Sequence, residues 1–284
     1  MSIIACTMKR IVYLSVLFIC ILGCQNKKEE TTSPEITQKE ASINANKDSL
    51  KTDSLATAIP ATIDEVFDDF IYGFTSNYSF QKKRIKFPLL HKINGAEVKS
   101  YEKNKWRFDA IHMKKDYYTV LYNKPSQIEI EKSKKLSQVS IELIYPLKHK
   151  FKQYEFKRLN GKWFLASICE NPLSKNKNAD FFSFYERFVN DSLYQRSHIR
   201  EPLGFVTYED GDPFKRIDGF VDIDQWFVFC PEMPRDILTN IDYGQTYNDP
   251  NKRVFVMHGN SNGMQCVFTF HRKKGEWVLV SFEN

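Results

Sequence analysis

Residues 67–89, FDDFIYGFTSNYSFQKKRIKFPL, decide the fold, because their pattern recurs at residues 181–203 as FFSFYERFVNDSLYQRSHIREPL. Matched residues lie at a constant separation of 114 positions. The separation is the same much farther along the chain, where Trp163 matches Trp277. Two matched blocks in one register indicate a tandem duplication.

Each copy of the repeat opens with a pattern typical of a helix. Apolar residues recur at i, i+3, i+4 and i+7, the spacing that gives a helix one apolar face. In the first copy these positions are Phe67, Phe70, Ile71 and Phe74. Thr62 and Glu65 form a capping-box pattern, so we expect the first helix to begin there.

Segments of period two follow the helices and predict β-strands. They comprise Val139, Ile141, Leu143 and Tyr145 in the first copy, and Val221, Ile223, Phe227 and Phe229 in the second. Asn160-Gly161 and Lys274-Gly275 lie between apolar runs, as in β-hairpin turns. A helical region followed by several antiparallel strands predicts the α+β class. The repeat then predicts two domains, residues 62–171 and residues 172–284.

With its Phe-rich helix leading to Gln81 or Gln195 and its closing hairpin with Trp163 or Trp277, the chain resembles the nuclear transport factor 2-like (cystatin-like) superfamily. In that superfamily helices pack into the concave face of a strongly curved antiparallel sheet. More narrowly, the chain is similar to uncharacterised bacterial lipoproteins with two such domains in tandem. The resemblance implies a fold and a pocket, but it implies no reaction, because one fold hosts many functions.

The first 23 residues have the pattern of a secretory signal peptide. Lys9 and Arg10 precede an apolar run, residues 11–22, which is too short to span a bilayer. The segment that ends this run, Ile21-Leu22-Gly23-Cys24, resembles a lipobox, which implies that Cys24 carries the lipid after cleavage. Several acyl chains on one residue give stable membrane anchoring.

Residues 24–61 read as a lipidated cysteine and a disordered tether. The stretch has no aromatic residue and is rich in Ser, Thr, Asn, Lys and Glu, so it cannot bury enough apolar surface to fold. Lys27-Lys28-Glu29-Glu30 is similar to a signal that sends some lipoproteins to the cell surface, and a solvated charge run is the alternative. We therefore expect an outer-membrane lipoprotein that faces either the periplasm or the exterior.

Charge is shared unevenly between the copies. Residues 62–171 contain 21 Lys and Arg against 13 Asp and Glu, whereas residues 172–284 contain 13 against 16. A basic surface outside the cytoplasm could meet an anionic envelope glycan, lipid or protein. Ordinary solubilising charge is the alternative, and a nucleic-acid partner is not expected in this compartment.

The cysteines and the candidate metal ligands predict little chemistry. Only Cys169, Cys230 and Cys266 follow the tether, and either Cys230 pairs with Cys266 or the thiols are free. Carboxylates at Asp218, Asp222 and Asp224 match no calcium loop, and His258 and His271 form no zinc motif. Asp222 and Asp224 fit better as the polar face of a strand. We predict no metal site and no cofactor.

Two groups of residues are candidates for a site. Enzymes of the superfamily place an acid or base inside the cone that the curved sheet and the helices enclose. The first copy offers Asp109 and His112 for this role. Tyr72 lies off the apolar stripe of the helix and is a poor partner for them. The second group mixes amides, a carboxylate and an aromatic ring, which is typical of ligand-binding surfaces, although a plain loop edge would look the same. Its members are Asn240, Asp242, Tyr243 and Gln245.

These patterns favour a membrane-anchored protein that binds or scaffolds an envelope or extracellular ligand and catalyses no reaction. The observations behind this hypothesis are the Cys24 anchor and the lack of a catalytic set in the sequence. One alternative is a small-molecule isomerase or hydrolase that uses the cone of the first copy. Another is a structural component of an envelope assembly, which a large exposed apolar patch would indicate.

Overall fold

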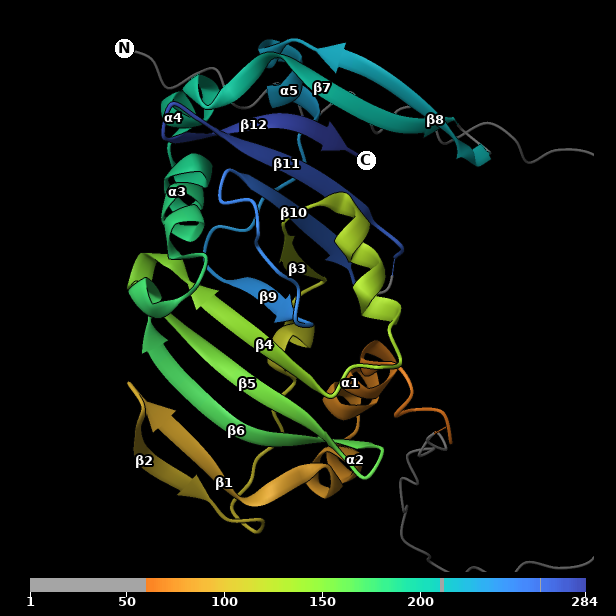
Figure 1. The fold of residues 1–284 in the computed structure, drawn as a ribbon, viewed down its shortest axis with the longest axis vertical. Helices are drawn as coiled ribbons and strands as arrows, with labels where there is room; N and C mark the ends of the chain where they lie inside the picture. The colour runs from red at the N-terminus through yellow and green to blue at the C-terminus, as the bar shows by residue number, and fades with distance from the viewer. Residues whose placement is uncertain (1–59, 210–211, 261) are drawn as a thin grey trace, which may run out of the picture. The chain divides into compact units, whose positions relative to one another are not determined.

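Figure 1 shows a computed structural model of the chain, which describes residues 60–209, 212–260 and 262–284. The predicted signal peptide, Cys24 and the tether up to residue 59 lie outside the described residues. Within those ranges, no helix has both the length and the apolar character needed to cross a bilayer.

Helices open both copies, as the repeat predicts. The first copy begins with α1 (Phe67–Ser76) and α2 (Tyr78–Lys83), and the second with α3 (Ala179–Asn190) and α4 (Ser192–Ser197). The predicted apolar face of α1 is buried. The predicted start at Thr62 is wrong, because residues 61–65 form turns in which the backbone N–H of Glu65 donates to the carbonyl of Thr62 at 2.8 Å.

Twelve described strands form two six-stranded sheets. The first sheet contains, in chain order, β1 (Ile85–Ile93), β2 (Ala96–Tyr101), β4 (Gln138–Tyr145), β5 (Lys150–Leu159), β6 (Lys162–Pro172) and β9 (Leu238–Asp242). The second contains β3 (Tyr117–Tyr122), β7 (Ile199–Glu209), β8 (Asp212–Val221), β10 (Lys252–Gly259), β11 (Gln265–Lys273) and β12 (Glu276–Glu283). Their orders are β2-β1-β6-β5-β4-β9 and β3-β10-β11-β12-β7-β8. Sheets with helices confirm the α+β class, but the prediction of purely antiparallel sheets is wrong, because β1 pairs with β6 and β12 pairs with β7 in parallel.

The two copies exchange one strand. β9 pairs with β4 although it comes from the second copy, and β3 pairs with β10 although it comes from the first. Where β3 meets β9, Thr119 and Thr239 bond each other reciprocally: each backbone N–H donates to the other hydroxyl, and each hydroxyl donates to the other carbonyl. The division into domains 62–171 and 172–284 stays a prediction, because each sheet contains a strand from the other copy.

The buried apolar side chains form two clusters, one around α1 and one around α3, and the alternating side chains of two strands contribute to both. Val120 and Tyr122 of β3 belong to the cluster around α1, whereas Leu121 between them belongs to the cluster around α3. β10 divides in the same way, with Val254 and Val256 in the first cluster and Phe255 in the second. Because successive side chains of a strand point to opposite faces, these strands contribute to both clusters.

The predicted hairpins are confirmed and one predicted strand is wrong. Asn160-Gly161 and Lys274-Gly275 both have positive φ at both positions, as a two-residue hairpin turn requires. β4 contains the alternating residues predicted for the first copy. In the second copy, however, Ile223–Phe229 is helix α5. Asp222 caps this helix, and Gln225 accepts from the Asp222 backbone N–H at 3.1 Å, so neither Asp222 nor Asp224 lies on the polar face of a strand.

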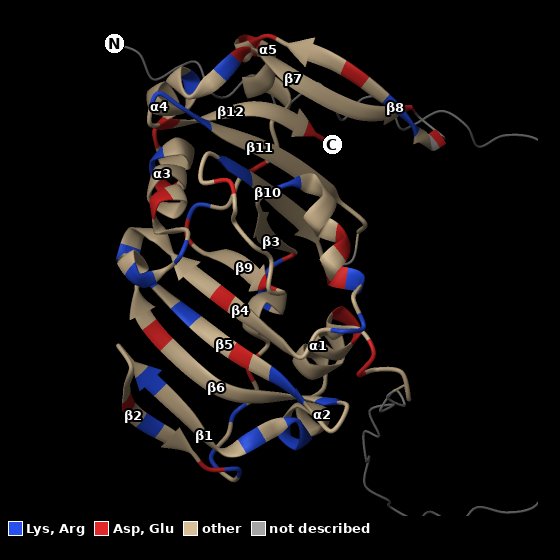
Figure 2. Ribbon diagram, viewed as in Figure 1, with Lys and Arg blue, Asp and Glu red and all other residues tan. Residues whose placement is uncertain are grey.

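Short 3-10 helices fill the connections, namely η1 (Ile111–Lys114), η2 (Pro125–Lys132), η3 (Pro146–Lys148) and η4 (Leu173–Lys175). Of these, η1 and η2 flank β3 and bring polar side chains close to α1. Figure 2 shows the lysine and arginine residues of the first copy along α2, β1 and β5. The basic excess of the first copy therefore includes β1 and β5, which are inner strands of the first sheet.

Candidate functional site

Two small cavities lie beside η1 and share one side chain, His112. One has a volume of about 160 Å³ and is lined by α1, η1, β3 and the end of β10. The other has a volume of about 130 Å³ and lies between η1, β4 and β9. We call them the acidic and the basic cavity, because the first contains Asp68 and no Lys or Arg, and the second contains Lys114 and Lys115 and no Asp or Glu.

The acidic cavity takes its lining from segments far apart in the chain. Asp68, Ile71 and Tyr72 stand at i, i+3 and i+4 on α1, which places them on one side of the helix next to its buried face. Tyr118 comes from β3, and Asn260 follows β10. The strand exchange therefore completes this cavity, since β10 belongs to the second copy and pairs with β3.

Asp68 is a partly buried carboxyl whose partner is a tyrosine. The hydroxyl of Tyr243 donates to Asp68 Oδ1 at 2.8 Å. Burial raises the pKa of Asp68 to about 6; the Tyr243 hydrogen bond opposes this shift, and the nearby charge of Glu131 adds to it. No Lys or Arg of the described chain forms an ion pair with Asp68.

A second carboxyl, Glu131 of η2, extends the polar cluster. It accepts a hydrogen bond from the Tyr122 hydroxyl, and His258 Nε2 lies 3.4 Å from its Oε1. The ring of His258 stacks on that of Tyr118, with 4.9 Å between centroids and 17° between planes. Burial, followed by the charges of Glu131 and Asp68, raises the pKa of Tyr118, so this phenol stays protonated at neutral pH.

His112 separates the two cavities. Its side chain is buried, with 5% of the residue exposed, and its ring meets that of Tyr118 edge to face at 5.6 Å. Burial lowers the pKa of His112 to about 4, so the imidazole is neutral at physiological pH. Its Nδ1 has no hydrogen-bond partner among the described residues. Such a buried polar atom costs free energy unless something binds it.

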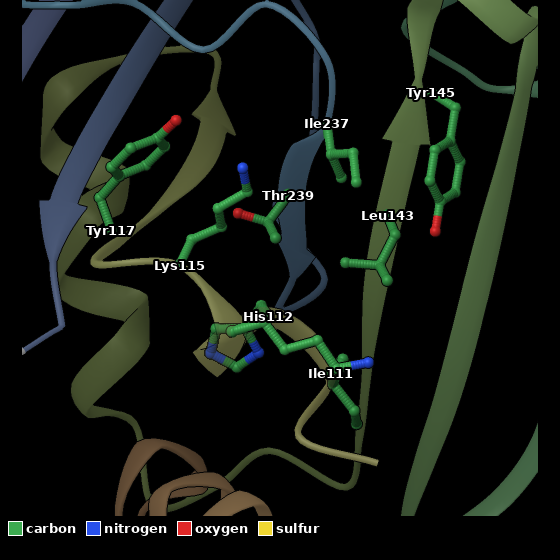
Figure 3. A pocket seen from close by; sticks show the side chains of 9 residues that line it. Ile111, His112, Lys115, Tyr117, Leu143, Tyr145, Ile237 and Thr239 are labelled. Atoms are coloured by element: carbon green, nitrogen blue, oxygen red, sulfur yellow. The ribbon is translucent and has the colours of Figure 1, made fainter.

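The basic cavity is shown in Figure 3. Leu143 and Tyr145 line it from β4, Thr239 lines it from β9, and Ile237 lies just before that strand. His112 and Ile111 of η1 lie on one side, and the Lys115 side chain extends toward Thr239. The two cavities therefore differ in charge but are both next to the same neutral imidazole.

Asp109, which the sequence nominated with His112, lines neither cavity. It accepts from the Tyr154 hydroxyl at 2.6 Å, from the Ile111 backbone N–H at 3.0 Å and from Lys114 Nζ at 3.2 Å. Burial alone would raise the pKa of Asp109, but these bonds outweigh it and lower the pKa. Tyr72 is 62% exposed, as its place off the apolar stripe predicts, and it stands at the rim of the acidic cavity.

The residues nominated as a binding loop hold β9 in place. Asn240 Oδ1 accepts from the Leu121 backbone N–H and its Nδ2 donates to Glu142, both within 2.9 Å. Gln245 Nε2 donates to the carbonyls of Leu121 and Ile241 at 3.0 Å. Tyr243 bonds Asp68, and Asp242 accepts from Lys177 Nζ at 2.7 Å. Ligand binding by these four residues stays a prediction, and in the structure they have protein partners.

Sequence reasoning missed Asp68, Tyr118, Glu131 and Asn260, and it dismissed His258. The repeat carried a usable signal for Asp68, because the matching residue 114 positions later is Phe182. A charged residue on a buried helix face, at a position where the other copy has an aromatic residue, marks a place where the copies have diverged. His258 and Asn260 come from the second copy, and the pairing of β10 with β3 brings them close to α1.

Metal and thiol chemistry receive little support from the described residues. They contain no group of three or more His, Cys, Asp or Glu side chains arranged to hold a metal ion. Cys169, Cys230 and Cys266 are free thiols. Burial raises the pKa of all three, which disfavours the reactive thiolate.

Two curved mixed sheets with helices at the start of each copy define a protein of the nuclear transport factor 2-like (NTF2-like) class. A crystal structure described as an NTF2-like protein from Bacteroides fragilis NCTC 9343 has this fold, with a TM-score of 0.73. The match has 36% sequence identity and covers 79% of this chain and 97% of that one. Residues 46–284 match the family described as Domain of unknown function (DUF4348), and the chain belongs to that family. No curated protein matches it.

Proposed function

We propose that this protein is a lipid-anchored binding protein of the bacterial envelope that holds a small ligand beside His112. The observation that carries the binding proposal is His112, which lines both cavities and whose buried Nδ1 has no partner among the described residues. A binding site needs a small number of polar groups at a concave surface. Asp68, Tyr118 and His112 line the acidic cavity and supply these polar groups.

The proposal is tested by asking what the full-length protein retains when it is purified from envelope. We expect mass spectrometry to detect a small molecule that the wild type retains and that His112→Phe, which removes both ring nitrogens from the two cavities, loses. The matched control is His271→Phe, since His271 is an exposed histidine of β11 and lies in neither cavity. Equal retention by His112→Phe and wild type would contradict a site at His112.

The anchor is a separate part of the proposal. Its support is the sequence pattern that ends in Cys24, and the tether would let the folded part stand away from the bilayer. We expect Cys24→Ala to abolish incorporation of labelled fatty acid. Retained label would show that another residue carries the lipid. Protease treatment of intact cells would decide whether the protein faces the exterior or the periplasm of an outer membrane.

An isomerase or hydrolase is the second candidate, and one observation favours it. A carboxyl whose pKa burial raises to about 6 stands in the same cavity as a neutral histidine, and such groups suit general acid-base catalysis near neutral pH. On this candidate the working acid or base is Asp68 and not Asp109. Release of a chemically altered compound from the purified protein, lost in Asp68→Asn, would distinguish an enzyme from a binding protein.

A structural role in an envelope assembly has support from a different surface. Large apolar side chains are exposed on β8 and α5, where Phe214 is 93% exposed, Phe220 70% and Val228 87%. Exposed apolar clusters often mark sites of association. Cross-linking in intact envelope, with wild type compared with Phe220→Ser, would reveal an assembly partner lost with this surface. The basic excess of the first copy offers a further contact for an anionic glycan, lipid or protein.

A further inference from the structure

The acidic cavity has more hydrogen-bond acceptors than its protein donors satisfy. The Asp68 carboxylate lines it, with only Oδ1 taken by Tyr243. His112 Nδ1 and Asn260 Oδ1 are both buried and have no partner among the described residues. Because Asn260 Nδ2 donates to the carbonyl of Lys115, the amide oxygen is the atom left free. Asp68 of α1, His112 of η1 and Asn260 at the end of β10 all line one space of about 160 Å³.

Among the described residues that line the acidic cavity, no Lys or Arg is present to bind these acceptors. Of the nearby groups, Glu131 and Asp69 add negative charge, and His258 lies beside Glu131 and outside the lining. A buried carboxylate normally requires a cation or several hydrogen bonds. Asp68 has one described hydrogen bond, from Tyr243, so its negative charge is only partly compensated within the protein.

The rim of the cavity suits a cation as well. Tyr118 and Tyr72 line it with aromatic rings, and the face of an aromatic ring attracts a positive charge. Met113 and Ile71 add apolar surface that would contact a short hydrocarbon chain. An anionic ligand would instead be repelled by Asp68 and Glu131, and a neutral alcohol would leave the charge of Asp68 uncompensated.

We propose that the acidic cavity binds the primary ammonium group of a small amine, with Asp68, His112 Nδ1 and Asn260 Oδ1 as the three acceptors. A primary ammonium has three N–H donors and no acceptor, which matches this set. The inference rests on the proposed function and names the ligand class for that site. The cavity volume restricts the ligand to a short chain.

The protonation states agree with this assignment. Above pH 6 Asp68 is ionised and accepts hydrogen bonds, and His112 stays neutral until the pH falls to about 4. In the tautomer that carries its proton on Nε2, the neutral imidazole accepts a hydrogen bond at Nδ1. The titratable or charged groups that face Asp68 are Asp69 on its own helix, Glu131 of η2, His258 of β10, Tyr118 of β3 and Tyr243 after β9. Amine affinity is therefore expected to fall as the pH drops below 6.

The test is calorimetric titration of the full-length protein with three probes of similar length: n-butylammonium, 1-butanol and butyrate. At about pH 7.5 we expect butylammonium to bind at least about ten-fold more tightly than butanol, and butyrate not to bind, because only the ammonium pairs with Asp68. Asp68→Asn should weaken butylammonium binding about ten-fold or more. Asp69→Asn is the matched control on the exposed side of the same helix turn and should leave the affinity within about two-fold.

Circular dichroism establishes that each variant is folded, and the wild type alone supplies a second readout. Its butylammonium affinity should fall about five-fold or more between pH 7.5 and pH 5, as Asp68 takes up a proton. Equal binding of butanol and butylammonium, or an unchanged affinity in Asp68→Asn, would overturn the ammonium assignment while leaving a binding cavity in place. Butylammonium binding that survives His112→Phe would instead contradict the proposed site itself.

Discussion

The two copies of the repeat share one arrangement of helices and strands but differ in the side chains beside their first helix. In the first, Asp68 of α1 lines a cavity, whereas the matching Phe182 of α3 is 1% exposed in a filled cluster. Across β10 and β3, His258 faces Tyr118, and at the matching register of β4 and β9, Ile144 faces Leu238. Because of the strand exchange, each of these pairs joins one residue from each copy. The pair in the cluster around α3 is apolar, and the pair near the acidic cavity is polar.

This difference indicates a division of labour after duplication. Phe182, Ile144 and Leu238 belong to one apolar cluster, whose burial supplies stability. A polar cavity with unpartnered atoms lowers stability and is kept where it serves a function. Because β3 and β9 are exchanged, the filled part and the hollow part share strands, and the stability of one supports the other.

The largest effect is expected from exchanging residues between the copies. Phe182→Asp would bury a carboxylate without a partner and should cost more than about 4 kcal/mol of the free energy of unfolding. The reverse change, Asp68→Phe, enters a cavity and should cost less than half as much. Urea denaturation measures both. Equal costs would show that the two positions do not differ in environment.

The strand exchange gives the next largest effect. Thr119→Val or Thr239→Val removes side-chain bonds from the reciprocal pair between β3 and β9, and each should cost about 1–3 kcal/mol. The double variant should cost less than the sum, because the two hydroxyls share one network. Thr207→Val, on the half-buried strand β7, is the control and should change stability by less than about 0.5 kcal/mol.

The acidic cavity should show a distinct pH dependence of stability. The folded pKa of Asp68 is raised from 3.8 to about 6, so the folded state favours the protonated carboxyl, and its contribution falls as the pH rises from about 4 to 6. His112 has a lowered folded pKa, so its contribution falls as the pH drops from 6.5 to about 4. Chemical denaturation across this range should show that Asp68→Asn loses the first slope and His112→Gln the second. Unchanged slopes would contradict the burial of these groups.

The smallest effect on stability is expected at the rim. Tyr72 and its match Glu186 both lie on the outer sides of their helices, and Tyr72→Ala or Glu186→Ala should change the free energy of unfolding by less than about 0.5 kcal/mol. Only Tyr72 lines the acidic cavity, so only Tyr72→Ala should weaken butylammonium binding, by about two- to five-fold. A similar loss in both variants would argue against a specific role for the cavity rim.

Local patterns predicted much of the fold and little of the site. The face of α1, strand β4 and both hairpins followed from spacing and turn residues, which act over a few positions. Residues 223–229 were wrongly expected to form a strand, because their apolar residues fit period two while Asp222 and Gln225 cap a helix. Asp109 was nominated because it is an acid near a histidine, but its hydrogen bonds to Tyr154 and Ile111 hold it outside the cavities.

The sequence by itself determined the duplication at a separation of 114, the α+β class and the resemblance to NTF2-like proteins, because periodicity and repeat register are properties of the linear chain. Only the tertiary structure decided that β3 and β9 change sheets and that the two copies share their clusters. It also decided which polar residues meet, since Asp68 and Asn260 are far apart in the chain. Their proximity depends on strand pairing between the copies, which no local pattern records.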